Sequence, residues 1–305
     1  MNPGYAFLLA RVIGMGLERP LVKRLGVERD NVASVVLYVG AGELMFLAVL
    51  AWQYMQNPAL AANLQSWLPL AIIPGLLNAA CFYSFIAAMR VGEVSLLTPL
   101  FASCFVLMYA IDVAAGFAQL AALPLAGVLL VTLGVAFLSP ARAVAGGRIS
   151  VWQRYDPRWL LRQPGAVLML VNATAFALVR FFDKSMASDA HPVLYALVVN
   201  LPTVLIGLVL LAVGSLRGKS SSMFALTALA RERWGILALL TIFGQGAFLM
   251  LLYALDYFPP SVIEPVTQLG VFIAIALGGL WFGEQTKARW LPAAMVVAGA
   301  ALLLV

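Results

Sequence analysis

Long runs of apolar residues, separated by short polar stretches, dominate this chain. A helix needs about 20 mostly apolar residues to cross the hydrocarbon core of a bilayer. We therefore predict an all-α integral membrane protein with ten transmembrane helices, of which the first is the least hydrophobic. They extend over roughly Gly4 to Leu25, Val32 to Met55, Trp67 to Arg90, Val94 to Ala115, Leu120 to Leu138, Gly165 to Ala187, Pro192 to Leu216, Trp234 to Tyr257, Pro260 to Gly283 and Ala288 to Val305.

The two halves of the sequence echo each other. With a shift of 161 positions, a Pro-Gly start and an Arg-x-x-x-Lys end recur, so that Arg19 falls on Arg180. With a shift of 166 positions, Ser95 and Pro99 fall on Ser261 and Pro265. We interpret residues 1–139 as a first five-helix repeat, 140–163 as a linker and 164–305 as a second five-helix repeat. Because five is odd, the two repeats must insert in opposite orientations.

The distribution of charge adds a prediction of how the protein is oriented in the membrane. The chain has 305 residues, 63% of them hydrophobic and 10% charged, with a net charge of +6. In the connections between spans, every Lys and Arg except Lys184 falls on one side, namely Arg19, Lys23, Arg24, Arg29, Arg90, Arg142, Arg148, Arg154, Arg158, Arg162, Arg217, Lys219, Arg231, Arg233, Lys287 and Arg289. This bias predicts a cytoplasmic linker and non-cytoplasmic termini in a bacterial inner membrane. It also argues against nucleic acid as a partner.

Polar side chains at mid-depth are expensive in lipid and usually face a bundle interior or a water-filled cavity. Here they occur at related positions of the two repeats. Arg11 corresponds to Asn172, Glu43 corresponds to Asn200, and Asn78 lies one position from the counterpart of Gln245. Since transporters with inverted repeats bind substrate at the repeat interface, we predict that these six residues line one substrate site.

Arg11 and Glu43 are the only opposite charges near mid-depth, so we expect each to neutralise the other. Two interpretations remain open. The pair is either a structural lock between two helices, or Arg11 binds a substrate carboxylate or phosphate while Glu43 accepts a proton or holds an amine.

Five further residues are weaker candidates for substrate binding. Arg180 shares a helical face with Asn172. Glu264 and Gln268 share a face near the expected kink at Pro265, and we expect Glu264 in a vestibule. Tyr83 and Tyr253 could stack on a ligand, although lone aromatic residues more often serve packing.

The chain lacks a Gly-rich phosphate loop with a lysine, HExxH and paired CxxC motifs. Cys81 and Cys104 lie in apolar spans, where we expect packed thiols, and His191 is the only histidine. We therefore predict a protein that is not an enzyme, with no metal and no cofactor.

Several segments resemble the drug/metabolite transporter superfamily, specifically its ten-helix EamA-type members. They are PPSVIEPV from Pro259 to Val266, the GGLWFGE that ends at Glu284 and the final span with Gly299, repeated in weaker form as VSLLTPLF and the Gly127 to Gly134 span. The resemblance implies two inverted five-helix repeats around a central cavity, and transport of small metabolites, often amino acids or related compounds, without a nucleotide cofactor. In two respects the chain departs from the pattern. Ala115 and Gly116 replace the Gly-Glu in the first half. Many members have cytoplasmic termini, whereas the charge bias of this chain predicts non-cytoplasmic termini.

The sequence thus favours a secondary active transporter of a small polar or amphipathic metabolite, working by alternating access with a coupling proton as one option. The expected partners are a small-molecule substrate and the lipid bilayer, and the oligomeric state stays open between monomer and homodimer. Two other classes remain. A lipid or headgroup flippase would need a polar cavity that opens sideways, and a membrane scaffold would have a dry, closed centre.

Overall fold

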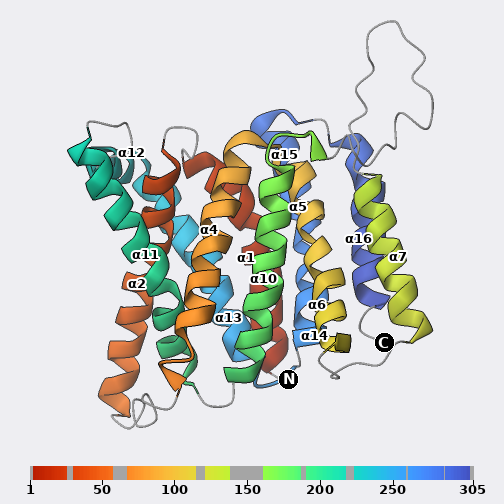
Figure 1. Ribbon diagram of the computed structural model, residues 1–305, viewed down its shortest axis with the longest axis horizontal. Helices are drawn as coiled ribbons and strands as arrows, with labels where there is room; N and C mark the ends of the chain where they lie inside the picture. The colour runs from red at the N-terminus through yellow and green to blue at the C-terminus, as the bar shows by residue number, and fades with distance from the viewer. Residues whose placement is uncertain are drawn as a thin grey trace, which may run out of the picture.

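The computed structural model describes residues 3–25, 30–57, 67–114, 121–137, 161–186, 190–217, 223–258, 260–284 and 286–302. Over these residues the regular structure is entirely helical (Figure 1). The helices are α1 Pro3–Leu25, α2 Asn31–Gln56, α4 Ile72–Val91, α5 Val94–Phe101, α6 Ser103–Ala114, α7 Ala122–Ala136, α10 Ala166–Met186, α11 Pro192–Leu216, α12 Met223–Leu240, η2 Thr241–Gln245, α13 Gly246–Ala254, α14 Pro260–Thr267, α15 Gly270–Phe282, η3 Lys287–Arg289 and α16 Trp290–Leu302. Most of the expected linker, with Arg142, Arg148, Arg154 and Arg158, lies outside the described residues.

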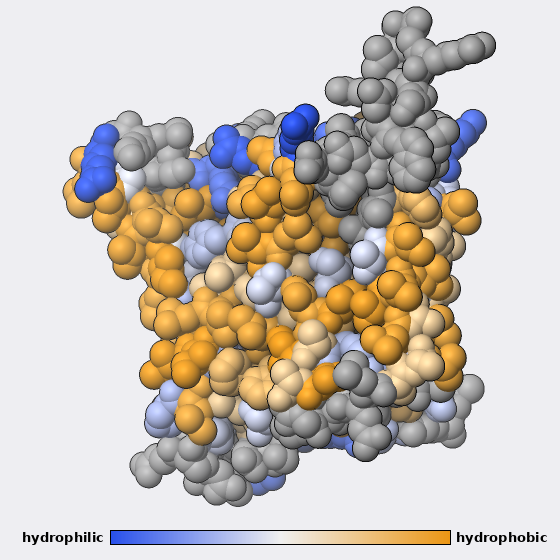
Figure 2. All heavy atoms as spheres, turned by 45° about the vertical axis from the view of Figure 1, so that its right-hand side comes forward, coloured by the Kyte–Doolittle hydropathy of each residue, from blue (hydrophilic) through white to orange (hydrophobic). Residues whose placement is uncertain are grey.

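The described helices account for the ten expected spans and confirm an all-α membrane fold. Six stretches are long and apolar enough to cross a membrane: Asn31–Gln56, Ile72–Val91, Val94–Ile111, Ala166–Asp183, Pro192–Leu216 and Met223–Ala254. Three shorter apolar helices fall in the fifth, ninth and tenth spans. Figure 2 shows the hydrophobic belt that results, with hydrophilic side chains gathered along its upper edge.

Two spans are interrupted at equivalent points of the two halves. α5 ends at Phe101 and α14 ends at Thr267, 166 positions later, and each helix has a proline two residues before its end. Proline has no amide hydrogen, so it removes one helical hydrogen bond and favours a local break. The backbone tightens at each break: the Ala102 amide donates to the Pro99 carbonyl at 3.0 Å, and the Leu269 amide to the Val266 carbonyl at 3.1 Å.

The eighth span differs from its expected form. Its helix begins at Met223, earlier than the predicted start at Trp234, and a kink at Arg233 (φ −121°, ψ 21°) separates residues 223–232 from the apolar part. Further along, Thr241–Gln245 forms a π-helical segment between α12 and α13. Such segments occur frequently at functional sites.

Helix packing follows a twofold pattern. α1 packs against α13 and α15, and its counterpart α10 packs against α4 and α6. α2 packs on α11, and α7 packs on α16 at one end of the molecule. In Figure 1, α1 begins at the lower face, where α16 ends, whereas α7 ends and α10 begins at the upper face. These opposite directions support the division into inverted repeats, which stays a prediction.

Small residues bring the outer pair of helices into close contact. A Cβ atom at Gly299 would lie 2.7 Å from the Val131 backbone nitrogen, and one at Gly134 would lie 2.8 Å from a Val296 methyl carbon. Packing through glycine is the usual way in which membrane helices approach closely. These two glycines therefore let α7 and α16 pack closely.

Candidate functional site

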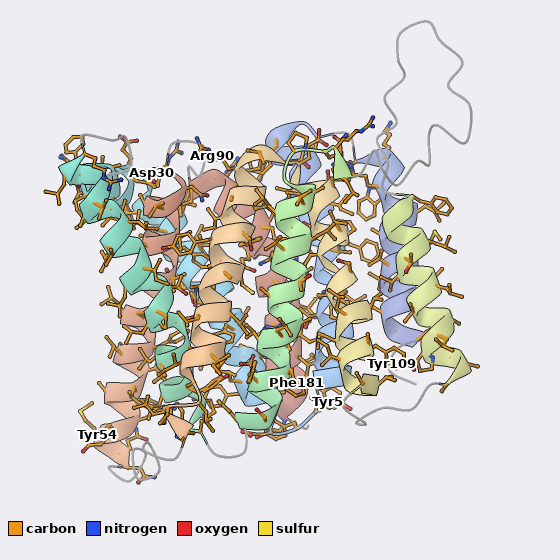
Figure 3. All side chains as sticks on the ribbon, viewed as in Figure 1. Tyr5, Asp30, Tyr54, Arg90, Tyr109 and Phe181 are labelled. Carbon is orange, nitrogen blue, oxygen red and sulfur yellow. The ribbon has the colours of Figure 1, made fainter. Side chains whose placement is uncertain are left out.

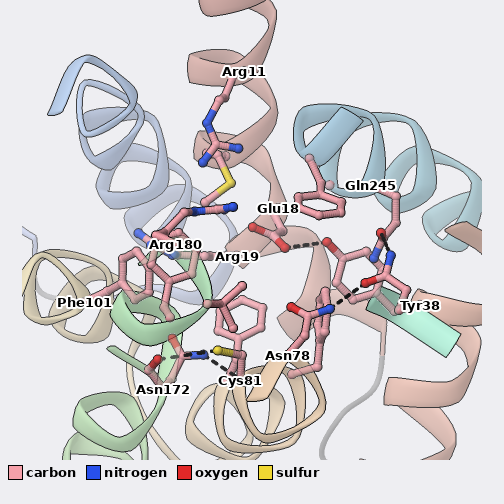
Figure 4. Close-up of a pocket in the computed structure, with 18 residues that line it drawn as sticks. Arg11, Glu18, Arg19, Tyr38, Asn78, Cys81, Phe101, Asn172, Arg180 and Gln245 are labelled. Atoms are coloured by element: carbon pink, nitrogen blue, oxygen red, sulfur yellow. Dashed lines mark hydrogen bonds between the residues drawn. The ribbon is translucent and has the colours of Figure 1, made fainter. Parts of the chain in front are cut away.

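A cavity of about 80 Å³ lies between the two halves of the chain (Figure 4). A buried water needs roughly 10–15 Å³ of such space, so several waters or a small molecule fit. The cavity wall is formed by Arg11, Met15, Glu18, Arg19, Tyr38, Asn78, Cys81, Phe82, Phe85, Phe101, Asn172, Phe176, Val179, Arg180, Asn200, Gly244, Gln245 and Phe248. Both halves therefore contribute to one polar site.

The structure brings a subset of the predicted site residues to this wall. Those on the wall are Arg11, Asn78, Asn172, Arg180, Asn200 and Gln245. Glu43, Tyr83, Tyr253, Glu264 and Gln268 do not line the cavity. The first group comes from α1, α4, α10, α11 and η2, which meet at the centre of the bundle.

Three amide side chains form a chain of hydrogen bonds across one side of the wall. Asn78 Nδ2 donates to Asn200 Oδ1 at 2.6 Å, and Asn200 Nδ2 donates to Gln245 Oε1 at 3.3 Å. Gln245 is 1% exposed, and its Nε2 has no hydrogen-bond partner among the described residues. This wall therefore offers a free hydrogen-bond donor to whatever occupies the cavity.

Arg11 does not pair with Glu43, so the predicted ion pair is wrong. Its Nη2 instead lies 2.9 Å and 3.1 Å from the two carboxylate oxygens of Glu264. Arg11 Nε donates to Thr267 Oγ1 at 3.2 Å, and Nη1 to the Ala247 carbonyl at 3.1 Å. The guanidinium is thus saturated by protein groups, and it ties α1 to α13 and α14.

Glu264 holds a second arginine as well. Arg180 Nε lies 2.8 Å from Glu264 Oε1, and Arg180 Nη1 lies 2.5 Å from Asp183 Oδ2. Tyr195 donates its hydroxyl to Asp183 Oδ1 at 2.6 Å. Glu264 is 1% exposed, so its expected place in a vestibule is also wrong. It lies in a buried ionic network instead.

The wall also contains Glu18, Arg19 and Tyr38, which the sequence did not single out as site residues. The Tyr38 hydroxyl donates a short hydrogen bond to Glu18. Arg19 was counted among the loop residues, but α1 continues to Leu25, and Arg19 is 5% exposed. One signal could have found it: its alignment with Arg180 in the repeat.

Two aromatic rings separate the aligned arginines. The Phe101 and Phe176 rings pack edge to face, with centroids 4.8 Å apart and an interplanar angle of 72°. Arg19 Cζ lies 4.7 Å from the Phe101 centroid, and Arg180 Cζ lies 4.3 Å from the Phe176 centroid. The two cation-π contacts thus flank one aromatic pair near the centre of the bundle.

Two predicted site residues lie off the wall in helix interfaces. Tyr83 donates its hydroxyl to the Thr203 carbonyl at 3.1 Å. Tyr253 accepts a hydrogen bond from Gln53 Nε2 at 2.8 Å and packs on Phe7. Both tyrosines therefore make packing contacts between helices.

Glu43 and Gln268 are buried but only partly satisfied. Glu43 is 9% exposed and Gln268 is 3% exposed, and Oε1 of each has no hydrogen-bond partner among the described residues. Glu43 follows Gly42, which packs against the Gln245 side chain, so it lies behind the cavity wall. Gln268 lies at the break between α14 and α15.

Glu284, which ends the GGLWFGE segment, joins the two halves at the upper face. Its carboxylate accepts hydrogen bonds from the Val94 amide (2.9 Å), the Ser95 amide (2.9 Å) and the Ser95 hydroxyl (2.5 Å), and so caps α5. Lys23 Nζ lies 3.1 Å away, and Arg289 bonds to Ser95. Burial raises the pKa of Glu284, but the Ser95 and Lys23 hydrogen bonds outweigh it and bring the pKa below its usual value.

Metal chemistry finds little support among the described residues. They contain no group of three or more His, Cys, Asp or Glu side chains that could hold a metal ion. Cys81 and Cys104 are buried free thiols, as predicted. His191 lies at the start of α11, where partial burial lowers its pKa.

The described residues form an all-α, multi-pass membrane fold with a cavity that side chains from both halves line. Residues 163–305 match the model of the EamA-like transporter family, so the second half of the chain is similar to that family of membrane transporters. The predicted resemblance to the drug/metabolite transporter superfamily is thereby confirmed.

The fold has a counterpart among solved structures. A crystal structure titled "Crystal structure of protein" aligns with a TM-score of 0.56 and 17% sequence identity, and the alignment covers 99% of this chain and 96% of that chain. At this identity the match shows the fold alone. The comparison with curated proteins finds no match.

Proposed function

We propose that this protein is a secondary active transporter, which moves a small polar or amphipathic metabolite across a bacterial inner membrane by alternating access. The observation that carries the proposal is the polar cavity between the two halves, to which α1, α2, α4 and α5 contribute from one half and α10, α11, η2 and α13 from the other. A site shared in this way changes shape when one half rocks against the other.

The interrupted helices support the same mechanism. α5 and α14 both end beside the bundle centre, and η2 holds Gln245 in the cavity wall. Breaks in a helix supply the local backbone freedom that a rocking motion needs. The breaks at Ala102 and Gln268 lie 166 positions apart, so both halves could bend in the same way.

Glu18 is our candidate for the group that binds a coupling proton. It lies on the cavity wall and is hydrogen-bonded by Tyr38, whereas Glu43 lies behind the wall. A carboxylate that faces both the substrate and water from alternate sides can exchange its proton during the transport cycle. This assignment replaces the earlier hypothesis for Glu43.

Transport by reconstituted protein tests the proposal. Proteoliposomes would be loaded with a defined mixture of small metabolites, and their loss from the lumen would be followed by mass spectrometry. We expect depletion of particular compounds, abolished by Asn200→Leu, which breaks the amide chain in the wall. Thr132→Val is the matched control, because Thr132 is exposed and bonds only to its own helix. Equal depletion by protein-free vesicles, or full activity of Asn200→Leu, would contradict the proposal.

A further inference from the structure

Arg19 differs from the other two arginines of the cavity in its charge partners. Arg11 and Arg180 share Glu264, and Arg180 also pairs with Asp183. Among the described residues no carboxylate lies within ion-pair distance of Arg19. With the described part of the chain it makes one hydrogen bond, from Nη1 to the Thr98 carbonyl at 3.3 Å.

The repeat explains this difference. Arg19 corresponds to Arg180 at a shift of 161, which places Val22 opposite Asp183. Thr98 corresponds to Glu264 at a shift of 166. Each arginine thus contacts the equivalent position of the interrupted helix in its own half, but the second half supplies a carboxylate there and the first half supplies only a backbone carbonyl.

Glu18 attracts Arg19 electrostatically but does not contact it. Its carboxylate bonds to the Tyr38 hydroxyl and makes no ion pair with Arg19 among the described residues. A guanidinium that is 5% exposed loses most of its hydration, and that loss is offset only by a paired anion or several hydrogen bonds. The planar guanidinium fits a carboxylate, sulfonate or phosphate especially well.

The other residues of the cavity wall indicate which further groups such a ligand would carry. The Phe101 ring covers one side of Arg19 and packs on Phe176, which suits an apolar or aromatic group. On the amide side, the unpartnered Gln245 Nε2 is a donor and requires an acceptor. The cavity wall therefore offers hydrogen-bond donors at Arg19 and Gln245, and the apolar rings of Phe101 and Phe176 beside Arg19.

We propose that the substrate is an organic oxyanion, whose acidic group binds Arg19 and whose apolar part packs on Phe101 and Phe176. This inference rests on the proposed transport function and names the substrate class of the same site. It assigns Arg19 as a substrate-binding residue and Arg11 and Arg180 as structural partners of Glu264.

Cys81, a free thiol on the cavity wall, allows the charge preference to be measured without knowing the substrate. In a Cys104→Ala background, Cys81 would be labelled by two membrane-impermeant methanethiosulfonates of similar size, the anionic sulfonatoethyl and the cationic trimethylammonioethyl reagent. Each rate would be divided by the rate for a small free thiol. We expect the anionic reagent to be favoured on the order of tenfold after this correction, and Arg19→Gln to remove the preference.

Arg24→Gln provides the matched control. Arg24 lies on the same helix and carries the same charge, but it is exposed and packs over Trp281 rather than facing the cavity. The anionic preference should survive this change. Equal corrected rates for both reagents, a preference for the cation, or an unaltered preference in Arg19→Gln would overturn the inference. Labelling of Cys81 by neither reagent from either side would instead contradict the transport function itself, because the cavity would then never reach water.

Competition identifies the source of the oxyanion. Phenylacetate should slow labelling in the Arg19 protein, whereas its neutral analogue phenylacetamide should not. Inorganic phosphate and vesicles containing phosphatidylglycerol would be tested in parallel, so that protection by the lipid alone would assign the same oxyanion chemistry to a headgroup. Protection by phenylacetamide equal to that by phenylacetate would overturn the proposal.

Discussion

Glu264 lies between Arg11 and Arg180, with Asp183 on the far side of Arg180. The two arginines and two carboxylates cancel each other's charge, and Thr267, Ala247 and Tyr195 supply further hydrogen bonds. A buried ion pair is worth little in net stability, but removal of one member leaves an isolated buried charge. The network therefore holds α1, α10 and α14 together, and substitution of any one of its charged residues should destabilise the fold.

Substitution of Arg180 tests this interpretation. Arg180→Gln leaves Asp183 without a cation and Glu264 with only one, so we expect a loss of about 3–5 kcal/mol in the free energy of unfolding. Arg19→Gln removes a cation that has no carboxylate partner and should cost far less. Reversible unfolding of both variants in mixed detergent micelles provides the measurement. A larger loss for Arg19→Gln than for Arg180→Gln would show that Arg19 has a structural anion after all.

Glu18 and Glu43 are buried and have no ion pair among the described residues, and the pH dependence of transport distinguishes them. We expect Glu18→Gln to flatten the dependence of the transport rate on pH, because of these two carboxylates only Glu18 lines the cavity. Glu43→Gln should keep the parental profile. Exchange of labelled for unlabelled substrate across the membrane needs no net proton movement. It therefore checks that each variant is folded and active. A flat profile for Glu43→Gln alone would return the coupling role to Glu43.

Site residues in this chain were predictable where they interrupt an apolar run. Arg11, Asn78, Asn172, Asn200 and Gln245 stand out as polar residues at mid-depth, and all reach the cavity wall. Their partners were not predictable. Arg11 and Glu264 are 253 positions apart, and only the packing of α1 on α14 brings them together. Glu43 shares α2 with Tyr38, and the sequence did not show that Tyr38, rather than Glu43, would reach the cavity wall.

At the scale of helices, the two interrupted helices, α5 and α14, each bond to the other half of the chain, α5 through Glu284 and α14 through Arg11. The expected kinks at Pro99 and Pro265 are matched by breaks within three residues of each proline. The π-helical turn at Thr241–Gln245 had no sequence signal, since its residues resemble their apolar neighbours. The burial of Arg19 was also not predicted, although the predicted first span already reached Leu25. A charge near the end of a helix can be buried against other helices instead of belonging to a connection.

The cap that Glu284 forms on α5 predicts a pH-dependent stability. The folded pKa of Glu284 is lower than its usual value, so its contribution is complete above about pH 4.3 and is lost as the pH falls through the folded pKa. At neutral pH we expect Glu284→Gln to lose about 1–3 kcal/mol, because charge-assisted hydrogen bonds to Ser95 and Lys23 disappear. Thermal unfolding of both proteins at a series of pH values gives the difference.

The difference between parent and Glu284→Gln should narrow in acid. Asp256→Asn, an exposed carboxylate in the turn after α13, is the control and should have little effect at any pH. A gap between parent and Glu284→Gln that stays constant into acid would contradict a role for the ionised carboxylate. It would point instead to a steric effect of the substitution.

For the whole molecule, the apolar runs determined most of what could be predicted. Each run is long enough to satisfy its backbone hydrogen bonds as a helix in lipid, so the class of fold followed from length and composition. The repeat added direction: helices α1 and α10 pack on equivalent partners. Charge pairing did not follow from the predicted repeat, because aligned positions of the two halves carry different side chains: Thr98 aligns with Glu264, and Arg11 aligns with Asn172. These differences make the cavity asymmetric.

Orientation in the membrane is the last property that the charge pattern predicts. Described basic residues of the connections lie at the upper edge, as Arg90 does in Figure 3, whereas Tyr54 lies at the lower edge. The positive-inside rule then places the upper face in the cytoplasm. We expect an impermeant maleimide added to intact cells to label Tyr54→Cys but not Val91→Cys, both exposed positions, in a background with Cys81→Ala and Cys104→Ala. Permeabilised cells should label both. Labelling of Val91→Cys alone in intact cells would invert the orientation, and the cavity would then exchange its inward and outward sides while its binding chemistry stayed the same.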